Sequence, residues 1–105
     1  MGATKRSVVL PSKMSYHERE KFFCACEVEE KRLGVLIASR IYNAMDSKIM
    51  TVFELARELG LSKRFVQQQL DGVVDFSFSE LARISLILRM RFNVLMVHDC
   101  EAPKK

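Results

Sequence analysis

Hydrophobic residues recur at helical spacing through the first half of the chain, starting just after residue 15. The Ser15-x-x-Glu18 pattern is a capping box, in which the serine oxygen accepts a backbone N–H and the glutamate folds back onto the cap. A helix is therefore expected over residues 16–45, with a break between Glu29 and Gly34 because so long a helix is unusual in a small domain. The apolar positions that carry this period are Phe22, Cys26, Leu33, Ile37, Ile41 and Met45.

The next segment predicts a short, well-capped helix. Residues 46–48 (Asp-Ser-Lys) have the composition of a turn. A second capping box at 51–54 (Thr-Val-Phe-Glu) should open a helix that runs through Leu59. Gly60 should end it, because glycine takes the left-handed backbone conformation at no steric cost.

Two more helices follow. Ser62 should cap a helix over residues 63–70, which Asp71-Gly72 closes. A third capping box at 77–80 (Ser-Phe-Ser-Glu) should open a helix that continues to about Arg89. The apolar stripe expected on this last helix consists of Leu81, Ala82, Ile84, Ile87 and Leu88.

The two ends of the chain differ from the helical part. Residues 92–97 are apolar and rich in β-branched side chains, which favours a short strand, with a fifth helix as the alternative. Residues 1–14 show no period and carry three basic residues, so a flexible basic arm is expected there, and a disordered tail over 99–105. The predicted fold is all-α, with four to five helices in a single domain over 15–98, an added N-terminal helix and that short C-terminal β-strand left open.

Composition narrows the function classes. The chain has 105 residues, of which 49% are hydrophobic and 29% charged, as in an ordinary soluble domain. It lacks an apolar run of the about 20 residues that span a bilayer, and no apolar signal core follows its start, so a cytoplasmic protein without membrane contact is expected. A net charge of +4 is compatible with nucleic acid but is weak support for it. No catalytic set or glycine-rich phosphate loop occurs, so we expect a binding protein without a cofactor rather than an enzyme.

The cysteines allow one sharper hypothesis. Cys24-x-Cys26 and His98-x-Cys100 supply four ligands of the kind that zinc prefers. The C-x-C spacing is tighter than that of common structural zinc sites, and an odd number of cysteines is typical of free thiols in a reducing compartment. Free thiols without a metal are therefore the favoured interpretation, with a zinc or thiol sensor as a competing one.

Residues 51–72 combine three features that two closely crossing helices require. Ala56 is small where the helices approach each other, and Gly60 four residues later suits the left-handed turn. Val66, six residues further on, is expected to fill the core between the helices, surrounded by Leu55, Leu59 and Leu61.

This stretch resembles the helix-turn-helix of the lambda-repressor-like (Cro/repressor-type) DNA-binding family. The resemblance continues at residues 76–84, which look like that family's fourth helix, and it covers about residues 33–90. It implies that helix 63–70 lies in the major groove of double-stranded DNA and that the protein is a dimeric transcriptional regulator, most simply a repressor, acting at the nucleoid of a prokaryotic or phage-infected cell.

Carried over by position, the resemblance implies a set of DNA-binding residues. Arginine and lysine can donate to guanine, glutamine can pair with adenine, and a serine at a helix start can meet a phosphate. Val52, Gln69 and Asp75 depart from the family pattern: Val52 loses a phosphate contact, Gln69 replaces an apolar side chain, and Asp75 would repel a phosphate. Part of the phosphate affinity is therefore expected from elsewhere. The expected DNA-binding residues are Ser62, Lys63, Arg64, Gln67 and Gln68, with Arg57 and Lys48 as backbone contacts.

The segments beyond the DNA-binding core are expected to serve association. A homodimer is predicted through residues 16–30 and 91–98, because one recognition helix reads only a few base pairs. The same surplus segments support an alternative, a protein-interaction factor of the antitoxin or phage-accessory kind. The residues expected in the core are Leu55, Ala56, Leu59, Leu61, Val66, Leu81, Ile84 and Leu88.

Overall fold

The computed structural model describes residues 10–97, and this part of the chain is all-helical. It contains one short 3-10 turn, η1 (Pro11–Lys13), and four α-helices, with no strand among the described residues. The N-terminal residues 1–9 and the expected tail 99–105 lie outside the described residues, so most of the predicted arm does as well. None of the described helices is both long and apolar enough to cross a membrane.

The first helix, α1 (Tyr16–Lys48), is continuous over 33 residues, and the predicted break was wrong. The charged segment continues the helix because its side chains are good helix formers and pair one turn apart. The guanidinium of Arg32 lies 2.6 Å from the carboxylate of Glu29. A single glycine in a helix, here Gly34, costs only about 1 kcal/mol.

The predicted turn at 46–48 was also wrong. These three residues form the last turn of α1, and the hydroxyl of Ser47 donates to the carbonyl of Ala44. The helix ends at Lys48, and the next residue, Ile49, caps it in the left-handed conformation (φ 54°).

Three short helices follow, and their caps confirm the predictions. The second helix, α2 (Val52–Leu59), and the fourth, α4 (Phe78–Leu88), each begin with a complete capping box. The third, α3 (Lys63–Leu70), begins at Ser62, whose side chain accepts the backbone N–H of Phe65. Between α2 and α3, Gly60 takes the left-handed conformation (φ 74°) that the turn requires.

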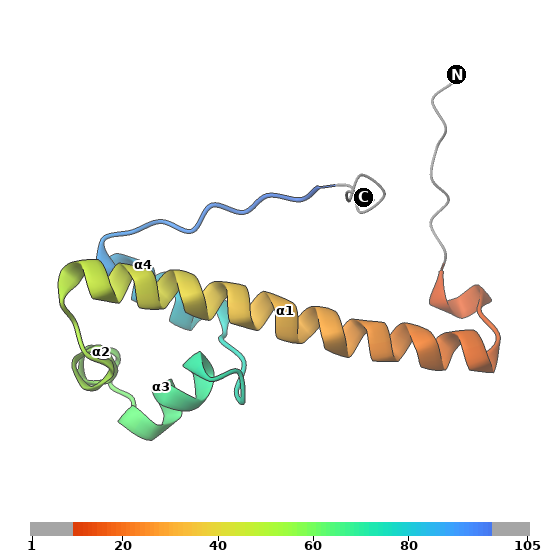
Figure 1. The fold of residues 1–105 in the computed structure, drawn as a ribbon, viewed down its shortest axis with the longest axis horizontal. Helices are drawn as coiled ribbons and strands as arrows, with labels where there is room; N and C mark the ends of the chain where they lie inside the picture. The colour runs from red at the N-terminus through yellow and green to blue at the C-terminus, as the bar shows by residue number, and fades with distance from the viewer. Residues whose placement is uncertain (1–9, 98–105) are drawn as a thin grey trace, which may run out of the picture.

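The core lies where the C-terminal half of α1 meets α2, α3 and α4 (Figure 1). Six of the eight residues predicted for the core are buried, whereas Leu61 and Leu81 are only partly buried and pack against it. Ala82, expected in the apolar stripe of α4, is exposed instead. The buried hydrophobic residues are Ala38, Ile41, Ala44, Met45, Leu55, Ala56, Leu59, Val66, Leu70, Ile84 and Leu88.

The segment after α4 forms neither the strand nor the helix expected for residues 92–97. Arg89 ends α4 in the left-handed conformation (φ 57°), and residues 91–97 have no regular secondary structure. A strand needs a hydrogen-bonding neighbour, and the described part of this chain contains none for these residues. Phe92 packs against the core, whereas residues 93–97 are exposed.

The molecule is elongated because α1 is much longer than the core that it helps to build. Its N-terminal half extends away from the other three helices (Figure 1). The radius of gyration is 18.0 Å, against about 13 Å for a compact domain of this length.

Candidate nucleic-acid interface

The third helix presents one face to the core and the opposite face to solvent. Val66, Gln69 and Leu70 are buried, and they fix the rotation of α3 about its own axis. Arg64 and Gln68, four residues apart, share the opposite face of the helix, and Gln67 lies at its edge. Lys63 is exposed because it is the first residue of the helix.

Four of the predicted site residues come together on this outer side. Lys63, Arg64, Gln67 and Gln68 line a shallow surface hollow of about 410 Å³. The two basic side chains are exposed, whereas the two glutamine side chains are half-buried. The hollow thus combines two cations with two side-chain amides.

Ser62 lies at the start of the same helix and acts as its cap. Its oxygen accepts the N–H of Phe65 at 3.1 Å, which leaves the hydroxyl proton free to donate outward. The backbone N–H groups of the first turn point out of the start of the helix, which is the positive end of the helix dipole. The arrangement can accept an anion beside the hollow.

Gln67 is held in place by a residue that the sequence did not single out. Its side-chain nitrogen donates to the hydroxyl of Tyr42 on α1 at 3.1 Å and to the carboxylate of Asp71 at 3.0 Å. These bonds orient the amide and leave its oxygen available as an acceptor. Tyr42 precedes Gln67 by 25 residues, and no local pattern in the sequence connects the two.

Lys48 and Arg57 do not line the hollow. Lys48 is the last residue of α1 and is exposed. The guanidinium of Arg57 lies 6.0 Å from the ring centre of Phe53 and 3.9 Å from the carboxylate of Glu58. Their expected role at the DNA backbone stays a prediction.

Gln69 is the buried polar residue of the domain, and it connects α3 to the start of α4. Its side-chain nitrogen donates to the carboxylate of Glu80 at 2.7 Å and to the backbone carbonyl of Asp75 at 3.3 Å. Its side-chain oxygen is buried without a hydrogen-bond partner among the described residues. Gln69 and its neighbour Leu70 are both buried, so both pack into the core where the family pattern has an apolar side chain.

The contact with Gln69 also affects an ionisable group. The pKa of Glu80 lies below its ordinary value chiefly because the backbone N–H of Ser77 donates to its carboxylate. Partial burial opposes this effect, and the bond from Gln69 adds to it. A lowered pKa in the folded state stabilises the fold above the ordinary glutamate pKa, and that stabilisation is lost as the pH falls through the lowered value.

Replacing Gln69 with leucine is therefore expected to destabilise the domain in a pH-dependent way. At pH 7 the loss should be about 1–3 kcal/mol, because an ionised carboxylate loses a buried donor. The loss should shrink in acid, where Glu80 is protonated in both proteins. Urea unfolding at pH 7 and pH 3 measures this, with Gln68→Leu on the solvent side as the control. An equal loss at both pH values would mean that Gln69 acts through packing and not through Glu80.

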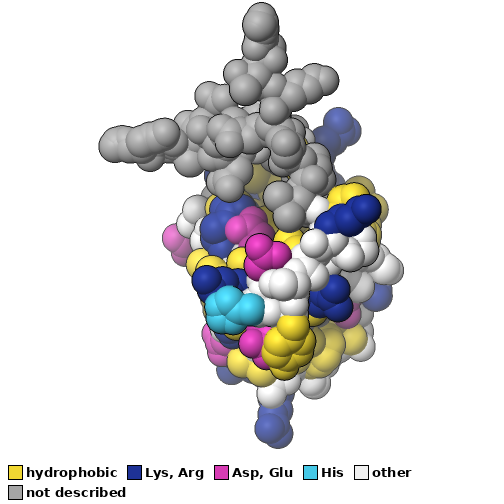
Figure 2. All heavy atoms as spheres, turned by 90° about the vertical axis from the view of Figure 1, so that its right-hand side faces the viewer, with side chains coloured by type: hydrophobic (Ala, Val, Ile, Leu, Met, Phe, Trp, Pro, Cys, Tyr) yellow, Lys and Arg dark blue, Asp and Glu magenta, His cyan; other side chains and the backbone are white. Residues whose placement is uncertain are grey.

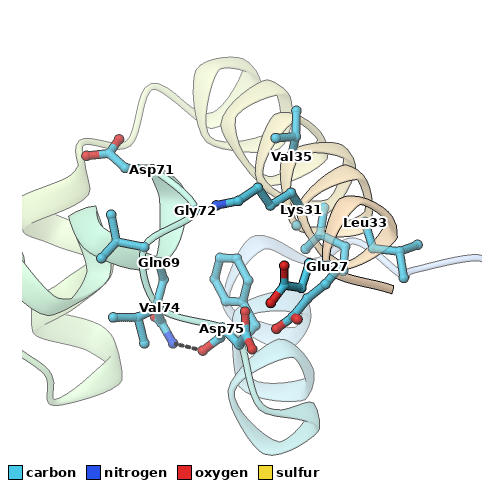
Figure 3. A pocket seen from close by; sticks show the side chains of 14 residues that line it. Glu27, Lys31, Leu33, Val35, Gln69, Asp71, Gly72, Val74 and Asp75 are labelled. Carbon is cyan, nitrogen blue, oxygen red and sulfur yellow. Dashed lines mark hydrogen bonds between the residues drawn. The ribbon is translucent and has the colours of Figure 1, made fainter. Parts of the chain in front are cut away.

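A second concave region lies between α1 and the loop after α3, and its chemistry is different. This cleft of about 680 Å³ is lined by Glu27, Glu30 and Asp75, and the side chains of Glu27 and Asp75 point towards the same space (Figure 3). Among the described residues that line it, Lys31 is the only basic one. An acidic cleft repels phosphate, so the hollow on α3 is the candidate nucleic-acid interface.

The described residues give no support to a zinc site. Cys24 and Cys26 lie on α1 and are exposed, with free thiols. His98 and Cys100, the other proposed ligands, lie outside the described residues. Within residues 10–97 no group of three or more histidine, cysteine or acidic side chains is arranged to hold a metal ion.

Comparisons of the chain with models of known protein families, with curated proteins and with solved structures found no match. The chemistry and geometry of the hollow on α3 therefore carry the functional proposal.

Proposed function

We propose that the protein binds double-stranded DNA in a sequence-specific manner as a dimeric transcriptional regulator, in its simplest form a repressor. The α3 helix is the element that enters the major groove. The observation that carries this proposal is the hollow on α3, where two cations and two amides share one solvent-facing surface.

The chemistry of these four side chains suits the edges of base pairs. Lysine and arginine donate to the guanine acceptors in the major groove, and the amide of a glutamine pairs with the donor and acceptor of adenine. Gln67 is already oriented by Tyr42 and Asp71, which use both of its donor protons, so its oxygen can accept from the amino group of adenine or cytosine with little loss of side-chain entropy. The two-point pairing with adenine is left to Gln68. The hydroxyl of Ser62 can donate to a phosphate at the edge of the groove.

The α2–turn–α3 arrangement supports the same proposal. It consists of two short helices joined by a left-handed glycine, with a third helix behind them. This is the arrangement expected from the sequence resemblance to the lambda-repressor-like family over about residues 33–90. On this basis the protein acts in the cytoplasm, at the nucleoid, and has no enzymatic activity or cofactor. It binds as a homodimer, since a single short helix reads only a few base pairs.

A second candidate function is an interaction factor whose main partner is another protein. The observation that favours it is the exposed apolar end of the described chain, where the side chains of residues 94–97 are each at least 80% exposed. A run of four such residues is a common mark of a protein-binding segment.

Selection of bound DNA from a random duplex pool by the purified full-length protein tests the first proposal. We expect enrichment of a site with two-fold symmetry, because a symmetric dimer presents two copies of α3. A parallel selection from a random RNA pool is the control and should give no enrichment. If the duplex pool shows no enrichment, sequence-specific DNA binding by α3 is refuted.

A further inference from the structure

The N-terminal half of α1 is a helix without a core of its own. All the buried residues of α1 lie at Ala38 or beyond, and residues 16–26 project from the domain (Figure 1), whereas Glu27, Glu30 and Leu33 line the acidic cleft beside the loop after α3. Hydrophobic side chains on this part of the helix remain in contact with water: Phe23 is 56% exposed and Leu33 is 45% exposed. Seen from its free end, the molecule shows hydrophobic side chains among acidic and basic ones (Figure 2). A helix of this length gains little stability in water unless its apolar side is covered.

Part of these exposed side chains follows the spacing of a coiled-coil seam, whereas Val28, 69% exposed, lies on the other side of the helix. From residue 16 to residue 33, six positions alternate at intervals of three and four residues and so fall on one stripe of the helix. Four of them are apolar and two carry opposite charges. These seam positions are Tyr16, Arg19, Phe23, Cys26, Glu30 and Leu33.

The seam is complementary to itself when two copies run in opposite directions. With the two-fold axis between residues 24 and 25, Phe23 faces the second copy's Cys26, and Arg19 faces the second copy's Glu30. Tyr16 then faces the second copy's Leu33. Each pair occurs twice, so the seam has four apolar layers and two layers in which opposite charges meet.

We propose that residues 16–33 of α1 form an antiparallel coiled coil with the same segment of a second copy of this chain. The alternative parallel pairing would place Arg19 against Arg19 and Glu30 against Glu30, and like charges in a seam are destabilising. The inference rests on the dimeric form in the proposed function, and it does not depend on DNA binding.

The surroundings of Glu30 provide separate support. Its carboxyl lies against the carboxyl of Asp75, which raises the pKa of Glu30 through a shared hydrogen bond and the like charge. Glu27 adds to this rise, and Lys31 opposes it. Within the described chain, Arg19 has no acidic partner, and its guanidinium donates to the carbonyl of Met14. The antiparallel pairing brings this free cation of one copy to the unbalanced acids of the other.

The flanks of the seam limit the strength of the dimer. In the same register, Glu20 lies opposite the second copy's Glu27, so two acidic pairs oppose association. Reversing one charge with Glu20→Lys should therefore tighten the dimer by about tenfold, because two repulsive contacts become attractive.

Analytical ultracentrifugation of the full-length protein without DNA tests the pairing. The wild-type protein is expected to form a dimer at micromolar concentration. Arg19→Glu and Glu30→Arg should each weaken it by about tenfold or more, because each substitution places two like-charged pairs in the seam. A mixture of the two variants should form a heterodimer, since an acid then faces a base at both sites. Lys21→Glu, a charge reversal on the far side of the helix, is the matched control and should leave the dimer unchanged.

Disulfide formation tests the direction of the helices. In a background with Cys24→Ser and Cys100→Ser, Phe23→Cys should place its new thiol opposite the second copy's Cys26 and form a covalent dimer on mild oxidation. The background protein alone should not crosslink, whereas a parallel pairing would join the two copies through Cys26. Val28→Cys, which points away from the seam, is the control.

The proposal is overturned by a wild-type monomer at high micromolar concentration, by single charge variants that dimerise like the wild type, or by a charge-variant mixture without a heterodimer. Crosslinking of the background protein alone would overturn the antiparallel direction. None of these results bears on the duplex selection, which tests DNA binding by itself, so the two proposals can fail separately.

Discussion

Replacing Lys63, Arg64, Gln67 and Gln68 together with alanine is expected to abolish sequence-specific DNA binding while the fold remains intact. Each good pairing with a base edge contributes about 1–3 kcal/mol of discrimination, so loss of the whole hollow should cost at least about a hundredfold in affinity for the preferred site. The fold should survive because none of the four side chains is buried in the core, and alanine is the best helix former.

Fluorescence anisotropy with the selected duplex and thermal unfolding by circular dichroism measure the two parts of this expectation. The matched control is Lys21→Ala combined with Arg91→Ala. Like the quadruple variant, it removes one lysine and one arginine, but from exposed positions outside the hollow. A folded quadruple variant with the affinity of the wild type would show that α3 does not read the groove.

Single substitutions should separate two kinds of contact within the hollow. Gln68→Ala is expected to weaken binding to the preferred site by about 1–3 kcal/mol and to affect random DNA little, because an amide reads base edges. Lys63→Ala is expected to weaken binding to all sequences alike, as for a phosphate contact. The slope of the logarithm of the binding constant against the logarithm of the salt concentration should then become shallower by about one, because one counterion fewer is released. Titrations of both duplexes at several salt concentrations distinguish these outcomes.

The second large effect is expected at the crossing of α2 and α3. Ala56 is 2% exposed, and the space around it is filled by the buried side chains of both helices. Ala56→Phe should destabilise the domain by about 3 kcal/mol or more, because a packed core has no volume for a ring. That is a large part of the about 5–15 kcal/mol that stabilises a typical domain.

Urea unfolding at one pH and protein concentration measures this loss. Ala82→Phe provides the matched control, because it makes the same substitution at an exposed position of a neighbouring helix. The control should change the free energy of unfolding by less than about 0.5 kcal/mol. If the two variants unfold at the same urea concentration, the close helix crossing at Ala56 is not a feature of this protein.

Local signals predicted the starts of the helices well, because the groups that decide a helix start are close together in sequence. A capping box spans four residues, and the serine or threonine and the glutamate that satisfy the helix start are both visible in the sequence at residues 15, 51 and 77. Gly60 is similar, since the left-handed turn depends on a single residue. The outward residues of α3 followed from the helical period and the resemblance.

Features that depend on distant partners could not be predicted in this way. The contact between Gln67 and Tyr42 joins residues 25 positions apart, and the buried amide of Gln69 is explained only by Glu80 on the next helix. The strand expected over 92–97 failed for the same reason. Its side chains have strand propensity, but propensity cannot supply the neighbouring strand that a ladder of hydrogen bonds requires. The break expected in α1 rested on typical helix lengths, which a projecting helix does not obey.

The continuity of α1 means that one helix has two different local stabilities. Its backbone amides near Ile41 and Met45 are protected by the core, and they open only when the whole domain unfolds. In a single copy, those before residue 27 are protected by the helix alone, so they can fray turn by turn from the N-terminal end while the rest of the molecule stays native, and pairing with a second copy would suppress this fraying. In the monomer, a substitution before residue 27 can therefore alter the helix content without altering the midpoint at which the core unfolds.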